Sequence, residues 1–143
     1  MYNCIIHPTD LQEDHVAYCE QSITLAHQLK ADIYFLHVLH LADTWQLAQG
    51  LGFAETVPLP IHDAKVVMYA LADRFNLGHD HMIIKQLSLQ QSILALIDDL
   101  QADLLVLGSK QQHFYQHEIF NISQEVGIHT NCDILMLHQS RKA

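Results

Sequence analysis

Asp103-Leu104-Leu105-Val106-Leu107-Gly108-Ser109-Lys110-Gln111 is the stretch of sequence that decides the fold. An unbroken apolar run that ends in glycine is typical of a strand that is buried on both faces, as strands are in parallel sheets covered by helices. The polar residues after Gly108 predict a loop that leads toward a helix. Ligands of parallel α/β sheets bind at this carboxyl end of the strands, so the loop is a candidate phosphate-binding loop.

Four more short apolar runs lie elsewhere in the chain, and segments of helical periodicity separate them. The runs are Tyr2–His7, Ile33–Leu39, a stretch within His81–Leu87, and Ile134–Leu137. Apolar residues recur every three or four positions at Val16, Cys19, Ile23 and Ala26, at Ile61, Ala64, Met68, Leu71 and Phe75, at Ile93, Leu96, Ile97 and Leu100, and at Ile119, Ile122 and Val126. This alternation predicts an α/β protein with a mainly parallel five-stranded sheet.

The helix boundaries carry local signals. We expect the first helix to end near Lys30, and Asn76-Leu77-Gly78 to stop the next one. Leu41 to Pro60 contains tryptophan, two glycines and two prolines and shows no clear period, so it predicts a long connection within the domain.

Length and composition exclude several classes of protein. The 143 residues are most simply one domain spanning 1–143, and the 16 acidic against 7 scattered basic residues argue against nucleic acid as a partner. No apolar run approaches the roughly 20 residues of a membrane span, and Met1 is not followed by a basic leader, so we expect a cytoplasmic protein without membrane contact. Three cysteines without a C-x-x-C pair predict buried thiols.

Four segments together resemble the universal stress protein family over nearly the whole chain. They are Ile5-Ile6-His7-Pro8-Thr9-Asp10, Leu36-His37-Val38, Ala102 to Ser109, and Cys132 to Leu137. The resemblance implies an open, twisted, Rossmann-like sheet of strand order 3-2-1-4-5 with helices on both faces. It also implies a homodimer formed largely through the last strand, Asp133, Ile134, Leu135, Met136 and Leu137.

The family has a branch that binds ATP or AMP and a branch, similar to universal stress protein A, that does not. The binding branch carries glycine, two residues, glycine, nine residues, and then glycine followed by serine or threonine. Here Gly108 is present, but Gln111 takes the second place and Asn121-Ile122 the third. Because glycine lets the backbone approach phosphate, these side chains argue against a working phosphate loop.

The adenosine side of the family's site is better kept. Thr9-Asp10 match the place where the binding branch presents a carboxylate near the adenosine, and Val38 matches the residue that meets the base. Asp10 is explained equally well as a helix N-cap. Ser123 is explained either as a cap of the last helix or as a displaced phosphate ligand. If nucleotide binding is retained, the resemblance assigns it to Pro8, Thr9, Asp10, Val38, Leu107, Gly108, Ser109, Gln111, Asn121, Ile122 and Ser123.

Other candidate sites are weaker. His113 and His117 have the spacing of metal ligands on a helix but lack an evident third ligand, and His79-Asp80-His81 lies in a predicted turn, so we expect no metal. No G-x-S-x-G nucleophile elbow occurs, which argues against an enzyme. The twelve histidines are explained either as surface residues or as containing a pH-sensing pair.

We therefore expect a non-catalytic universal stress protein that binds no cofactor and acts in stress tolerance through dimerisation and protein contacts. The alternative is a nucleotide-dependent switch that binds ATP or AMP with Mg²⁺.

Overall fold

The computed structural model describes residues 1–11, 15–39, 59–86, 88–109 and 116–138. The strands are β1 (Cys4–Pro8), β2 (Asp32–Val38), β3 (Met82–Lys85), β4 (Leu104–Gly108) and β5 (Asp133–Leu137). The helices are α1 (His15–Leu29), α3 (Leu59–Arg74), α4 (Leu89–Leu100) and α5 (Gln116–His129), with a 3₁₀ turn, η2 (His79–His81), before β3. The predicted alternation of strands and helices is therefore confirmed. Most of the expected long connection, residues 40–58, lies outside the described residues.

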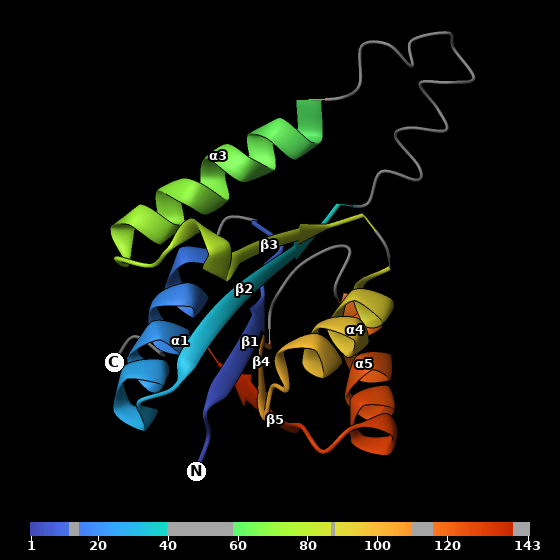
Figure 1. Ribbon diagram of the computed structural model, residues 1–143. Coiled ribbons are helices and arrows are strands. Elements are labelled where there is room, and N and C mark those ends of the chain that lie inside the picture. Colours follow the sequence, from blue (N-terminus) through green and yellow to red (C-terminus); the bar gives the residue numbers. More distant parts are fainter. Residues whose placement is uncertain (12–14, 40–58, 87, 110–115, 139–143) are drawn as a thin grey trace, which may run out of the picture.

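The sheet has the order β3-β2-β1-β4-β5, and its four neighbouring pairs are all parallel (Figure 1). This confirms the predicted fold class and strand order. A parallel pair requires a crossover connection, and the helices between successive strands provide it. The central strands β1 and β4 are buried along their whole length, as their apolar runs predict.

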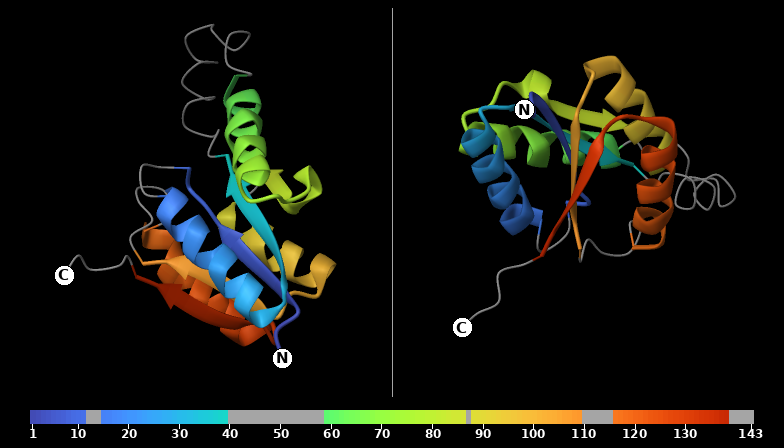
Figure 2. Two further views of the ribbon diagram at one scale, coloured as in Figure 1. Left: turned by 90° about the vertical axis from the view of Figure 1, so that its left-hand side faces the viewer. Right: turned by 90° about the horizontal axis from the view of Figure 1, so that it is seen from below.

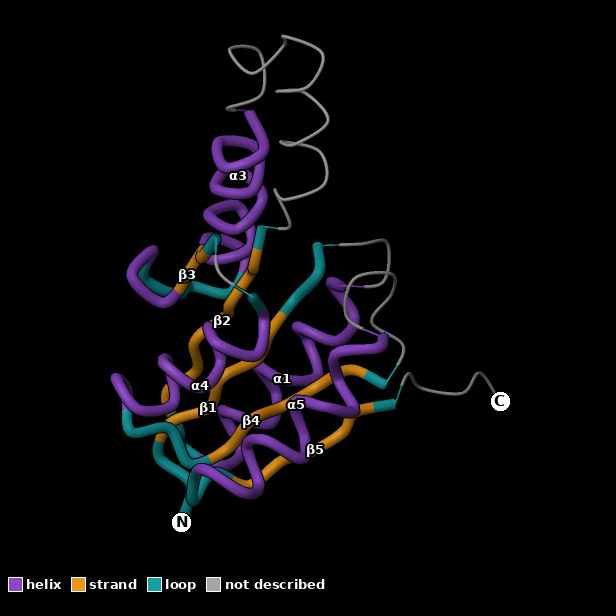
Figure 3. Tube along the Cα trace, turned by 90° about the vertical axis from the view of Figure 1, so that its right-hand side faces the viewer, coloured by secondary structure: helices purple, strands orange, loops and turns teal. Residues whose placement is uncertain are grey.

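Helices cover both faces of the sheet. Helices α1 and α3 lie on one face and α4 and α5 on the other (Figures 2 and 3). Alternate residues of one strand belong to different core clusters: Ile5 packs in the cluster that contains α1 and α3 residues, and Ile6 in the one that contains α4 and α5 residues. Since side chains alternate across a strand, an unbroken apolar run fills both clusters at once.

The start of α3 differs from the expected boundary, whereas the end of this helix and the position of β3 agree with the predictions. Helix α3 begins at Leu59, so Pro60 lies in its first turn, where a missing N–H is tolerated. After α3 the left-handed residue is Asn76, with φ 56°, whereas Gly78 has φ −63°. The turn η2 occupies His79–His81, and β3 lies within the predicted segment His81–Leu87, with Ile83 and Ile84 at its centre.

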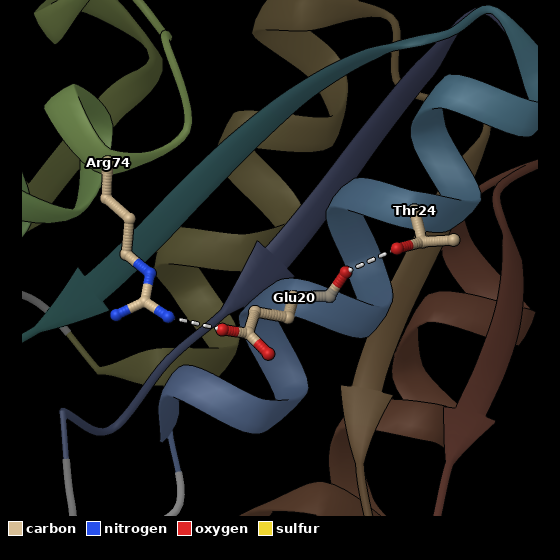
Figure 4. Close-up of polar contacts among 3 residues, drawn as sticks. All are labelled: Glu20, Thr24 and Arg74. Atoms are coloured by element: carbon tan, nitrogen blue, oxygen red, sulfur yellow. Dashed lines mark hydrogen bonds and ion pairs between the residues drawn. The ribbon is translucent and has the colours of Figure 1, made fainter.

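Helices α1 and α3 are also joined at the surface. Arg74 at the end of α3 donates to Glu20 of α1 at 2.6 Å, and the Thr24 hydroxyl donates to the Glu20 carbonyl oxygen at 3.0 Å (Figure 4). Both charged side chains are about half exposed, so solvent screens the ion pair and its contribution to stability is small. The apolar core rather than this pair holds the two helices together.

The cysteines agree with a further prediction. Cys4, Cys19 and Cys132 are free and buried. Among the described helices, none combines the length and the apolar composition needed to cross a membrane.

Asp103 joins the starts of β1 and β4. Its carboxylate accepts the Asn3 N–H at 2.9 and 3.1 Å and the Cys4 N–H at 3.0 Å. We expect Asp103→Ala to lower the free energy of unfolding by about 2 kcal/mol, because it leaves backbone donors without their charged acceptor. Urea denaturation measures this loss, and Asp99→Ala, at an exposed carboxylate of α4, is the control. Equal losses in the two variants would contradict the assigned role of Asp103.

Candidate functional site

The sheet order reverses at β1, which lies between β2 and β4. In open parallel sheets this is the position where ligands bind, outside the carboxyl ends of the strands. The strands end here at Pro8, Val38 and Gly108, on the same edge of the sheet. We call this region, Pro8–Leu11 with Val38 and Leu107–Ser109, the switch-point edge. It brings together seven of the predicted nucleotide-binding residues: Pro8, Thr9, Asp10, Val38, Leu107, Gly108 and Ser109.

Thr9 is the most firmly held residue of this edge, and its side chain is 0% exposed. Its N–H donates to the Leu36 carbonyl oxygen at 2.8 Å, and its own carbonyl oxygen accepts from Nδ1 of His37 at 2.8 Å. Its hydroxyl accepts the Leu11 N–H at 3.3 Å and also hydrogen bonds with Cys19. These contacts hold the backbone after β1 in one conformation.

The Cys19 thiol lies on α1 beneath this loop. Burial raises the pKa of Cys19 to about 12, against a smaller opposing effect of the Thr9 hydroxyl. A thiol that stays protonated at neutral pH is a weak nucleophile. Cys19 therefore packs beneath the loop as a protonated thiol.

Asp10 is 7% exposed and follows Thr9 directly. Helix α1 is described from His15 onward, and residues 12–14 between Leu11 and this helix lie outside the described residues, so the capping role of Asp10 stays a prediction. Leu11 follows with φ 56°, a left-handed conformation that disfavours side chains with a Cβ. A strained residue beside a buried carboxylate is a common feature of binding loops.

The phosphate side differs from the expectation. The Ser109 N–H donates to the Leu137 carbonyl oxygen at 2.8 Å, so this amide is used within the sheet. The Ser109 hydroxyl oxygen is buried and has no hydrogen-bond partner within the described part of the chain. Gln111 lies outside the described residues.

Asn121, Ile122 and Ser123 lie in the interior of α5, which begins at Gln116. The prediction that Ser123 caps this helix, or lies near its N-terminus, is therefore wrong. Ile122 is 0% exposed and belongs to the core cluster that contains Leu107 and Val126. Ile122, which the family resemblance matched to the serine or threonine of the nucleotide-binding branch, is thus a buried core residue.

Two histidines at this edge were not singled out from the sequence. His37 donates to Thr9, as described, and His7 is 0% exposed, with Nδ1 2.8 Å from the Val106 carbonyl oxygen. The available signal was their position: each is a polar residue within an otherwise apolar strand. Because a carbonyl oxygen only accepts, Nδ1 carries the proton in both rings.

The histidines of η2 have structural partners. His79 stacks on Tyr69 with a centroid distance of 4.2 Å and pairs with Asp73 at 2.9 Å. His81 stacks on Tyr34 at 4.4 Å and donates from Nδ1 to the Ile33 carbonyl oxygen at 2.7 Å. Among the described residues no group of three His, Cys, Asp or Glu side chains is placed to hold a metal ion. The predicted pair His113 and His117 lies outside the described side chains.

The parallel sheet, its reversal at β1 and the loop after that strand define a Rossmann-like α/β protein. The sequence model of the universal stress protein family matches residues 1–138, and the chain belongs to this family. The resemblance inferred from the sequence is confirmed.

Individual relatives agree with this assignment. The chain is 26% identical over 117 residues to universal stress protein A homolog 2 of Coxiella burnetii, a match that covers 81% of this chain and 80% of the relative. The universal stress protein UspA of Lactobacillus plantarum has a similar structure, with a TM-score of 0.71, 18% identity and coverage of 95% and 97% of the two chains. A universal stress protein in complex with cAMP has a TM-score of 0.62, 15% identity and coverage of 97% and 98%. These structural likenesses concern the fold.

Proposed function

We propose that this universal stress protein is a non-catalytic cytoplasmic protein that does not bind ATP and acts in stress tolerance through protein contacts made as a homodimer. The observation that carries the proposal is Ile122, which is fully buried at the position where the nucleotide-binding branch has serine or threonine. A triphosphate needs polar donors and positive charge at this point, and an alkyl side chain supplies neither.

Two further features support the absence of a triphosphate site. The Ser109 amide is already bonded to Leu137, so it is not available to a phosphate without breaking the end of the β4–β5 pairing. The described residues of the switch-point edge include no lysine or arginine, and Lys110, which follows Ser109, lies outside the described part of the chain. Phosphate oxygens placed there would lose their hydration without gaining comparable partners.

A second candidate is binding of an adenine nucleotide that has a single phosphate. It is favoured by the residues that the family resemblance assigns to the adenosine, which are Thr9, Asp10 and Val38. Thr9 is held by four contacts, Asp10 is nearly buried, and Val38 ends the neighbouring strand. The similar structure described as a cAMP complex supports this choice of ligand class. In this candidate Asp10 accepts a hydrogen bond from the sugar.

Calorimetry with Mg-ATP, AMP and cAMP distinguishes the two candidates. We expect no binding of Mg-ATP tighter than about 1 mM, because that free energy, about −4 kcal/mol, already requires several good phosphate contacts. If AMP or cAMP binds, Asp10→Asn should weaken it about tenfold by removing one charge-assisted hydrogen bond. Micromolar binding of Mg-ATP, or ATP released from freshly purified protein on denaturation, would overturn the main proposal. Unchanged affinity of Asp10→Asn would reject the second.

The homodimer is proposed to form through β5, Asp133, Ile134, Leu135, Met136 and Leu137. Among the described strands, β5 pairs with β4 on one side only. It has four consecutive apolar residues and neither lysine nor proline, whereas the opposite edge strand β3 has four residues and ends in the exposed Lys85. Edges that are not protected by such residues are the ones that pair with another chain.

The hydrogen bonds to β4 indicate which backbone groups a partner strand would meet. Asp133 donates to the Asp103 carbonyl oxygen, and Leu137 accepts from the Ser109 amide. Since alternate residues of an edge strand bond to the same neighbour, Ile134 and Met136 direct their N–H and C=O groups outward. An antiparallel second copy of β5 would bond to these two residues.

A further inference from the structure

His7 is a fully buried histidine whose ring is only half satisfied. It is 0% exposed, and its Nδ1–H donates to the Val106 carbonyl oxygen of β4 at 2.8 Å. Its Nε2 is buried and has no hydrogen-bond partner within the described part of the chain. The edge of the ring meets Phe35 of β2, with a centroid distance of 5.6 Å and an interplanar angle of 89°.

The hydrogen bond of His7 lies where β1 and β4 part from each other. The paired residues of these strands are Ile5 with Leu104 and Ile6 with Leu105, whereas the pairing of β1 with β2 continues to Pro8. Beyond Leu105 the imidazole supplies the link between β1 and β4. This link lies two residues before Thr9, at the base of the switch-point edge.

Within the described part of the chain, the electrostatic influences on His7 include no carboxylate. The face of β1 that carries Ile5 packs against α1 and α3, and α3 contributes the apolar buried residues Met68, Leu71 and Ala72. The titratable groups of the neighbouring elements are His15, Tyr18 and Cys19 on α1, His37 on β2 and Asp10 after β1. Of these, His15 acts on His7 electrostatically, and its positive form disfavours a second positive charge.

We propose that His7 is a pH-sensitive element: its neutral ring joins β1 to β4, and protonation at Nε2 separates the two strands at the switch-point edge. A proton on Nε2 would create both a buried charge and a buried donor without an acceptor. Opening of the edge gives the charged ring access to water. The proposal does not depend on whether a nucleotide binds there.

The direction of the pH dependence follows from the pKa of His7. Burial lowers this pKa to about 4; the Val106 hydrogen bond opposes the decrease, and His15 adds to it. In the open state the ring regains an ordinary pKa near 6.5. Between these two values the open state binds more protons than the closed state, so the opening equilibrium rises as pH falls. The increase is about 150-fold at pH 4 and approaches a limit of about 300-fold only well below pH 4, and the effect is absent well above pH 6.5.

Amide hydrogen exchange of the full chain at pH 7.5 and 5.0 tests the proposal, with His7→Asn as the decisive variant. Asparagine can place an amide N–H near the position of Nδ1 but does not titrate. After correction for intrinsic exchange, opening at the Val106 amide, which faces β1 because the Ser109 amide three residues further on bonds to β5, should rise about 25-fold in the unmodified protein and stay nearly constant in His7→Asn. His27→Asn, at an exposed histidine of α1, should behave like the unmodified protein.

Equal pH dependence in the unmodified protein and in His7→Asn would overturn the proposal. If His7→Asn does not fold, NMR titration of the imidazole in the unmodified protein decides the matter. A His7 ring that titrates below pH 5 supports the proposal, whereas one that titrates near pH 6.5 contradicts it.

Discussion

Ile122→Ser is expected to lower the free energy of unfolding by about 3 kcal/mol and still not to create ATP binding. Ile122 is 0% exposed and packs with Leu107 and Val126 between α5 and the sheet. Serine removes the buried alkyl groups, leaves a cavity and adds a hydroxyl that must find a partner in an apolar environment. The hydroxyl introduced at position 122 supplies neither the glycines that the nucleotide-binding branch carries after Gly108 nor a positive charge.

Urea denaturation and calorimetry with Mg-ATP measure the two effects. Ile128→Ser is the matched control on the same helix, because Ile128 is 71% exposed and its replacement should change stability by less than about 0.5 kcal/mol. Equal losses at the two positions would show that Ile122 is not a core residue. Tight ATP binding by Ile122→Ser would show that one side chain, and not the whole altered loop, excludes the nucleotide.

Met136→Pro is expected to convert the proposed homodimer into a monomer. Met136 directs its N–H away from β4, so proline at this position removes a hydrogen bond to the partner while leaving the β4–β5 pairing intact. By two-fold symmetry the dimer loses two such bonds. The loss of both bonds should weaken the dimer about 100-fold, or roughly 3 kcal/mol.

Light scattering at micromolar concentration provides the measurement. Met136→Ala is the control, since it removes the same side chain but keeps the N–H, and it should remain dimeric. A monomeric unmodified protein would contradict the proposed dimer. A dimeric Met136→Pro would place the contact elsewhere than on the outer edge of β5.

The strands were predictable because each is a short apolar run bounded by polar or turn residues. Leu104–Gly108 and Cys4–Pro8 are buried over their full length, and burial on both faces is what an unbroken apolar run requires. The helix boundaries were less predictable. The start of α3 at Leu59 was not expected, whereas Asn76, within the predicted stop, takes the left-handed conformation that asparagine tolerates.

The candidate site was only partly predictable. Thr9, Asp10 and Gly108 were expected at one edge because the carboxyl ends of parallel strands meet there. The interior position of Ser123 in α5 was not expected, since the start of that helix at Gln116 carries no strong capping signal. The role of His7 was also missed, because periodicity places a residue on a face but does not reveal the partners of its polar atoms.

The sequence by itself determined the α/β class, the family and the departures from the glycine motif after Gly108. These properties depend on local patterns: apolar runs, helical spacing and the identity of residues at fixed separations. The tertiary structure decided what the departures mean. It placed Ile122 in the core, bonded the Ser109 amide to Leu137 and linked His7 to Val106 where β1 and β4 part. Such contacts join residues that are far apart in the chain, so strand order and packing specify them and no local pattern contains them.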